Sequence, residues 1–80
     1  MTFCYKVEIE VSISGKDPYI HYEYMFYERA NEPSEIVVKM DALEQMKDKN
    51  GIKNAKHVHP ITVEEFKEQL FKNNITEDIN

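Results

Sequence analysis

An alternation of apolar and polar side chains near the start of the chain limits the fold more than any other feature. Over residues 3–13 every odd position is apolar, and the even positions are polar apart from Cys4. Successive side chains of a strand point to opposite faces, so the pattern predicts one long strand with one buried face. A second strand should follow to pair with it.

The next two segments have the properties of a turn and of that second strand. Residues 14–18 read Ser-Gly-Lys-Asp-Pro, with a glycine for positive φ and a proline that fixes φ, which predicts a hairpin turn. Aromatic and aliphatic residues then recur at even positions, and we expect them to share one face with the odd residues of the first strand: Ile20, Tyr22, Tyr24 and Phe26.

A helix is predicted after the hairpin. Asn31 or Glu32 would cap it, Pro33 would be tolerated in its first turn, and Gly51 would end it in a left-handed conformation. The side chains at helical spacing that we expect it to bury are Ile36, Val37, Met40 and Leu43, with Met46 at the edge of the stripe.

A third strand and a second helix should follow. Residues 52–59 favour a strand that pairs with the first strand. Thr62 and Glu65 have the spacing of a capping box, and Ile61 with Phe66 that of a hydrophobic staple, so the second helix should begin there. Its predicted buried stripe consists of Val63, Phe66, Leu70 and Phe71.

This order of elements indicates a two-layer α+β fold, β-hairpin–α–β–α. A right-handed crossover from the second strand gives a three-stranded antiparallel sheet of order 2-1-3, and we expect both helices to cover one face of it. A chain of 80 residues has room for one domain. We assign it to residues 1–74, with the second helix ending near Asn74 and a polar C-terminal tail over residues 75–80.

Composition narrows the classes of partner. The formal charge of −5, from 15 acidic and 10 basic residues, offers no basic field for a nucleic-acid backbone. The single Cys4 cannot form an internal disulfide, and no run approaches the roughly 18 apolar residues that cross a bilayer. We therefore expect a cytoplasmic protein without direct nucleic-acid or membrane binding. Its Lys, Ile and Asn content is typical of an AT-rich genome, such as that of a low-GC bacterium or its phage.

The leading functional prediction is a small acidic, non-enzymatic protein-interaction module. It would bind a protein partner, or itself as a homodimer, through the outer sheet face and the edge formed by the second strand. An inhibitor or adaptor of the kind that phages and mobile elements encode fits this description. The predicted partner-binding residues on that outer face are Glu8, Glu10, Glu23, Met25 and Tyr27.

The alternative prediction is a protein that binds a metal or small ligand. His57 and His59 are two apart, so on a strand both imidazoles project from one face, and His21 could add a third ligand. Cys4 and His57 could form a thiolate–imidazole pair, but no third orienting residue or oxyanion-hole glycine stretch accompanies them. With no Gly-rich phosphate loop either, we expect neither an enzyme nor a cofactor.

Overall fold

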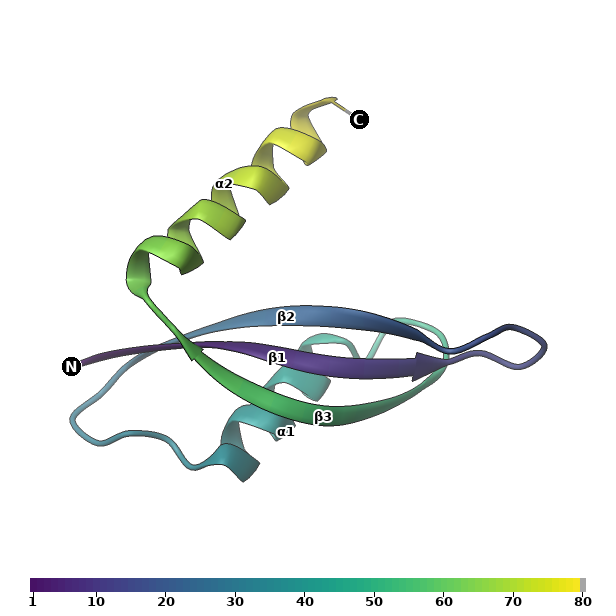
Figure 1. The fold of residues 1–80 in the computed structure, drawn as a ribbon, viewed down its shortest axis with the longest axis horizontal. Helices are drawn as coiled ribbons and strands as arrows, with labels where there is room; N and C mark the ends of the chain where they lie inside the picture. The colour runs from purple at the N-terminus through teal and green to yellow at the C-terminus, as the bar shows by residue number, and fades with distance from the viewer. Residues whose placement is uncertain (80) are drawn as a thin grey trace.

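The computed structural model of the protein describes residues 1–79, and the side chains of residues 1–72. Its elements in chain order are β1 (Thr2–Ser12), β2 (Tyr19–Glu28), α1 (Glu35–Gln45), β3 (Ile52–Ile61) and α2 (Val63–Ile79) (Figure 1). The three strands form an antiparallel sheet of order β2-β1-β3, so the predicted α+β class and strand order are confirmed. Among the described residues, no helix is long and apolar enough to cross a membrane.

The hydrophobic core lies between the central strand β1 and helix α1. The odd residues of β1 from Tyr5 to Val11 are buried, as the alternation predicted. Helix α1 covers them with side chains spaced four apart, which lie on one side of a helix. These α1 residues are Val38, Ala42 and, at its C-cap, Met46.

The facing of β2 differs from the prediction. In the hairpin register Tyr5 is opposite Met25 and Val7 is opposite Glu23, so odd residues pair with odd residues. Directly opposite residues share a face. The odd side chains of β2 therefore lie on the α1 side of the sheet, and the predicted inward residues Ile20, Tyr22, Tyr24 and Phe26 lie on the other side.

Helix α1 begins later than predicted and buries only part of the predicted stripe. Met46 is buried and Leu43 packs against the core, but Val38 and Ala42 take the place of Ile36, Val37 and Met40. Its N-cap is Ser34, whose Oγ accepts a hydrogen bond from the Val37 backbone N–H at 3.2 Å, in place of Asn31 or Glu32. Ile36 and Met40 are exposed, at 71% and 64%. The helix carries apolar residues around much of its circumference, and the side with Val38 and Ala42 is the one that packs against the sheet.

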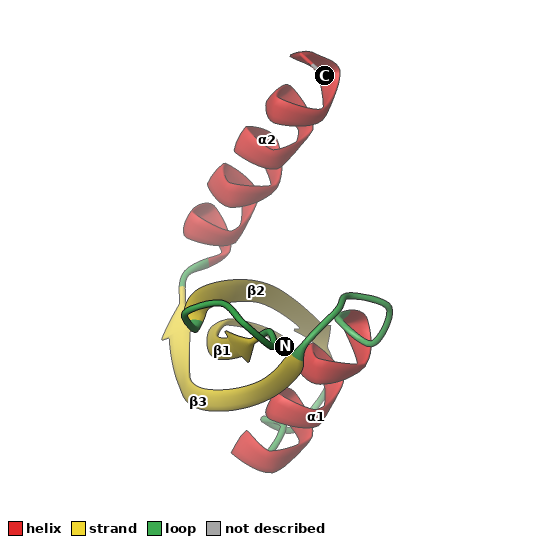
Figure 2. Cartoon of the chain, turned by 90° about the vertical axis from the view of Figure 1, so that its right-hand side faces the viewer, coloured by secondary structure: helices red, strands yellow, loops and turns green. Residues whose placement is uncertain are grey.

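Helix α2 begins at the predicted cap, where Thr62 Oγ1 accepts a hydrogen bond from the Glu65 N–H at 3.1 Å. It does not share the α1 face as expected. Its Phe66 contacts Phe26, on the opposite side of the sheet, and the helix then leads away from the strands (Figures 1 and 2). It continues to Ile79, past the predicted end near Asn74, because no glycine or proline interrupts it. Asn80 of the predicted 75–80 tail lies outside the described residues.

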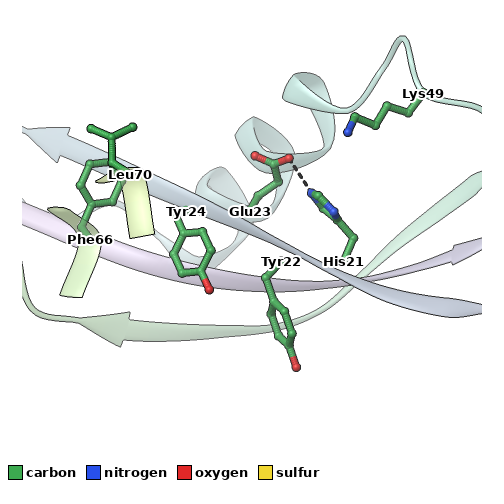
Figure 3. A pocket seen from close by; sticks show the side chains of 7 residues that line it. All are labelled: His21, Tyr22, Glu23, Tyr24, Lys49, Phe66 and Leu70. Atoms are coloured by element: carbon green, nitrogen blue, oxygen red, sulfur yellow. Dashed lines mark hydrogen bonds and ion pairs between the residues drawn. The ribbon is translucent and has the colours of Figure 1, made fainter. Parts of the chain in front are cut away.

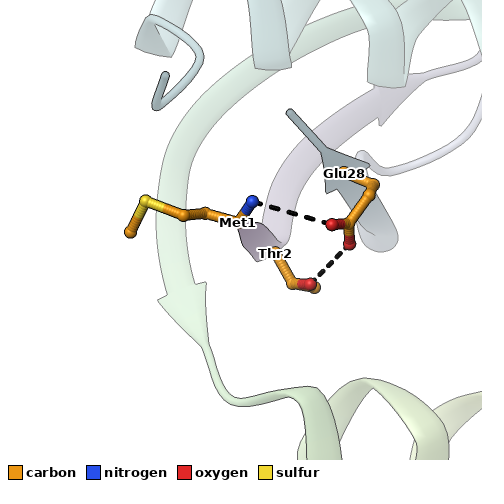
Figure 4. Close-up of polar contacts among 3 residues, drawn as sticks. All are labelled: Met1, Thr2 and Glu28. Carbon is orange, nitrogen blue, oxygen red and sulfur yellow. Dashed lines mark hydrogen bonds and ion pairs between the residues drawn. The ribbon is translucent and has the colours of Figure 1, made fainter. Parts of the chain in front are cut away.

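Polar contacts join the first residues of β1 to the last residue of β2. Thr2 Oγ1 donates a hydrogen bond to Glu28 Oε2 at 2.6 Å, and the Met1 amino group lies 3.6 Å from the other oxygen of that carboxylate (Figure 4). The Thr2 hydrogen bond lowers the pKa of Glu28, and the amino group adds to that shift. The first residues of β1 are thereby held against the end of β2.

Candidate functional site

Helix α1 leaves one face of the sheet uncovered, and we call it the open face. It consists of the even residues of β1 and β2 with their neighbours on β3. Phe66 of α2 covers only one end of it, where Cys4 is buried. Burial at that end raises the pKa of the Cys4 thiol. Ile20 and Tyr22, beyond that end, remain exposed to solvent, and Phe26 is still 48% exposed although Phe66 contacts it.

Charges on the open face are mixed rather than purely acidic. Lys6 Nζ lies 4.3 Å from the centre of the Tyr22 ring, which is a cation–π distance. Lys56 Nζ lies 4.0 Å from Glu10 Oε1. Glu8 sits between Tyr22 on one neighbouring strand and His57 on the other. The two glutamates of this face, Glu8 and Glu10, are therefore balanced by Lys6 and Lys56. The main feature of the open face is its exposed aromatic surface and not a negative charge.

The five residues predicted to bind a partner do not all lie together. Glu8 and Glu10 are on the open face, but Glu23, Met25 and Tyr27 project toward α1. Met25 is buried in the core. Tyr27 donates a hydrogen bond to Asp41 Oδ2 of α1 at 2.8 Å. Burial first, then this bond to Asp41, raises the pKa of Tyr27 far above its ordinary value.

The three histidines also divide between the faces. His57 and His59 share the open face as predicted, with ring centroids 6.0 Å apart. His21 is opposite Ile9 and projects to the α1 side, where its Nε2 lies 2.8 Å from Glu23 Oε1. Within residues 1–72, no group of three or more His, Cys, Asp or Glu side chains is placed to hold a metal ion.

A groove runs along the free edge of β2 (Figure 3). Its volume is about 270 Å³. Consecutive β2 residues, from His21 to Tyr24, form its floor and come from both faces of the strand. Phe66 and Leu70 of α2 line one end and Lys49, after α1, lines the other. The groove therefore exposes the strand edge itself, between an apolar end and a basic end.

The two edges of the sheet are built differently. The β3 edge contains Pro60, Lys53 and Lys56, and its pairing with β1 shifts register between Glu8 and Ile9. Prolines, lysines and bulges are the usual features that keep an edge strand from pairing with other chains. The ten residues of β2 include none of these, and their register with β1 is regular throughout. β2 is the edge that is open to pairing.

Sequence reasoning named the edge strand but missed most residues that surround it. Tyr22 and Tyr24 were assigned to the core, and so were Phe66 and Leu70, although Leu70 is 51% exposed. The available signal was the composition of β2, which carries large apolar side chains on both faces, although His21 and Glu23 interrupt one of them. A strand of that kind cannot bury both faces against a single helix, so one of them had to remain uncovered.

Comparisons of the chain with protein-family models, with curated proteins and with solved structures found no match.

Proposed function

We propose that this protein is a non-enzymatic interaction module that binds a protein partner, or another copy of itself, through the open face and the β2 edge. The observation that carries the proposal is the exposed aromatic and aliphatic surface around that edge. Phe26 is 48% exposed and Tyr22 39% exposed, and Tyr22 lines the groove together with Leu70 of α2. Exposed apolar surface bordered by polar residues is characteristic of protein-binding sites.

The polar border supports the same proposal. Lys6 and Glu10 are partly buried along the open face, each already engaged with a neighbour. Polar groups at the rim of an interface contribute to orientation and specificity, whereas the aromatic centre contributes most of the affinity. The acidic character of the whole chain, at −5, disfavours nucleic acid as the partner.

A comparison of surface variants in affinity purification tests this function. Tagged wild-type protein is incubated with lysate of its native host, and retained proteins are identified by mass spectrometry. Two variants probe the surface: Tyr22→Lys at its aromatic centre, and Glu8→Lys with Glu10→Lys at its charged part. We expect a protein retained in near-stoichiometric amount by the wild type to be lost or strongly reduced with both variants.

The matched control is Asp17→Lys with Asp48→Lys. Both aspartates are exposed and lie outside the sheet, so the control changes the net charge as the double glutamate variant does. Retention should equal that of the wild type. A partner that binds all four proteins equally would remove the open face and the β2 edge from consideration.

A further inference from the structure

We infer that the occupant of the β2 edge is β2 of a second copy of this chain, paired in the antiparallel direction about a two-fold axis at Tyr22. This inference rests on the proposed function, since it identifies the partner of the same surface. The pairing joins the three strands of each copy into one continuous sheet, with both α1 helices on one side.

The backbone of β2 supports strand pairing as the mode of contact. Its ten residues are regularly extended, and one side of the strand is bonded to β1 while the other is the sheet edge. Addition of a strand to such an edge satisfies its free N–H and C=O groups. The groove along residues 21–24 leaves this edge uncovered by other parts of the described chain.

Symmetry restricts the register of two identical strands. Directly opposite residues share a face, so odd residues of one copy must pair with odd residues of the other, and even with even. The two-fold axis therefore passes through a position where a residue lies opposite the same residue of the second copy. Glu23 opposite Glu23 would place like charges together, which destabilises a strand pair. Near the middle of the strand, the axis then falls at Tyr22 or at Tyr24.

The charged groups favour Tyr22. With the axis there, His21 lies opposite Glu23 of the second copy, so the two-fold symmetry creates two histidine–carboxylate pairs across the interface. The same two side chains already form a hydrogen bond within one chain, between His21 Nε2 and Glu23 Oε1 at 2.8 Å. Lys49 lines the groove on the His21 side and would lie near the incoming carboxylate (Figure 3). An axis at Tyr24 would instead place Glu23 opposite Met25.

The apolar groups favour the same register. An axis at Tyr22 brings Ile20 of the second copy opposite Tyr24, next to Phe66 and Leu70 at the apolar end of the groove. Ile20 is 45% exposed and Leu70 is 51% exposed in the single chain. The pairing thus covers exposed apolar side chains of the sheet with those of α2, at both symmetric positions.

Sedimentation velocity of the full chain over a concentration series tests the association. We expect the wild type to sediment as a dimer that dissociates on dilution. Tyr22→Lys places two lysines against each other at the axis and should weaken the dimer at least tenfold. Asn54→Lys adds the same charge to the open face at the opposite, β3 edge and should leave the dimer unchanged. Circular dichroism checks that both variants are folded.

Disulfide formation tests the register. In a Cys4→Ala background, Tyr22→Cys places two thiols directly opposite each other, and mild oxidation should link the copies rapidly. Tyr24→Cys should link them more slowly, and Asn54→Cys should not link them specifically. Faster linking through Tyr24→Cys than through Tyr22→Cys would overturn the proposed axis.

A wild type that remains monomeric at every concentration would overturn the self-pairing. If Tyr22→Lys then still abolishes capture of a different protein, the proposed function stands and only the identity of the partner changes. If the chain is monomeric and the surface variants alter no capture, both proposals fail. A dimer that Tyr22→Lys dissociates and Asn54→Lys preserves supports the inference directly.

Discussion

The rings of Phe26 and Phe66 lie 5.4 Å apart, inclined at 42°, and this contact joins α2 to the open face of the sheet. Phe26 is opposite Cys4 in the hairpin, and Ile61 is opposite Cys4 on the other side. The thiol therefore sits beneath the region where α2 meets the strands. Because Cys4 is only 4% exposed, its reactivity reports whether the helix stays in place.

Phe66→Ala should increase the rate at which Cys4 reacts with a thiol reagent. Loss of an aromatic pair weakens a contact by about 0.5–1.5 kcal/mol beyond the lost burial. A change of about 1.4 kcal/mol corresponds to roughly tenfold in the opening equilibrium, so we expect an increase on that order. Phe71→Ala, at a residue that is 64% exposed, is the control and should react as slowly as the wild type. Equal rates for all three proteins would show that α2 does not protect the thiol.

Ile9→Ala should be among the most destabilising truncations in the chain. Ile9 is completely buried at the centre of the core between β1 and α1, so its truncation leaves a cavity. Such substitutions lower the free energy of unfolding by about 2–5 kcal/mol. Ile52→Ala removes the same atoms from a side chain that is 78% exposed and should change it by less than about 0.5 kcal/mol. Urea unfolding followed by circular dichroism measures both, and similar midpoints would contradict this core.

Gly51→Ala should cost more stability than Gly15→Ala. Both glycines have positive φ, +109° and +80°, where an alanine costs about 1–2 kcal/mol. A Cβ on Gly51 would also lie 2.9 Å from the Ser12 carbonyl oxygen, whereas one on Gly15 would meet nothing within 4 Å. Thermal unfolding of the two variants side by side measures the difference. A larger loss in Gly15→Ala would argue against the close approach of Gly51 to the end of β1.

Ser34→Ala should shorten or loosen α1. The Ser34 hydroxyl accepts the hydrogen bond of an otherwise unpaired N–H in the first turn, and loss of such a cap costs about 1 kcal/mol. Ser34→Asp keeps an acceptor at the same position and should restore most of the stability. The free energy of unfolding in urea distinguishes the two. If aspartate and alanine are equally destabilising, the cap is not at Ser34.

Alkaline pH should destabilise the fold through two tyrosines. Burial, followed by the hydrogen bond to Asp41, raises the pKa of Tyr27, and burial, followed by Glu32, raises that of Tyr5. Above about pH 10 the unfolded chain, with tyrosine pKa values near 10, releases these protons, whereas the folded protein still retains them. Their stabilising contribution is complete below about pH 10 and declines as the pH rises further.

Urea unfolding at pH 8 and at pH 10.5 measures this decline, and tyrosinate absorbance follows the ionisation. Tyr27→Phe removes one of the two groups and should reduce the loss of stability between the two pH values. A decline of the same size in Tyr27→Phe and the wild type would show that Tyr27 does not contribute to it.

The elements of the fold were predictable because each rests on local chemistry. The alternation over residues 3–13 indicated β1, and Thr62 indicated the start of α2. The facing of β2 was not predictable in the same way, because large apolar side chains occur on both faces and the face toward α1 is the one that also carries His21 and Glu23. The register of the hairpin decides which face of β2 meets α1, and that register depends on how loop 13–18 closes, with Val11 opposite Tyr19.

The candidate site was predicted in part for the same reason. Glu8 and Glu10 belong to the strand with clear alternation, and their placement on the open face followed from it. Met25 and Tyr27 belong to the ambiguous strand and lie on the other face. The side of α1 that packs was equally undetermined from sequence, since Val38 and Ile36 are both apolar, yet Val38 is completely buried and Ile36 is 71% exposed.

The difference between the two edges of the sheet also limits how many copies of the chain could join through their strands. When two copies join through β2, the only strand left at either end of the combined sheet is β3. Pro60 has no N–H to donate to a further strand, and the register shift between Glu8 and Ile9 makes the β3 strand irregular. We therefore expect neither end to accept a third copy. If the copies pair through β2 as proposed, the association should stop at a discrete pair and not extend into a filament.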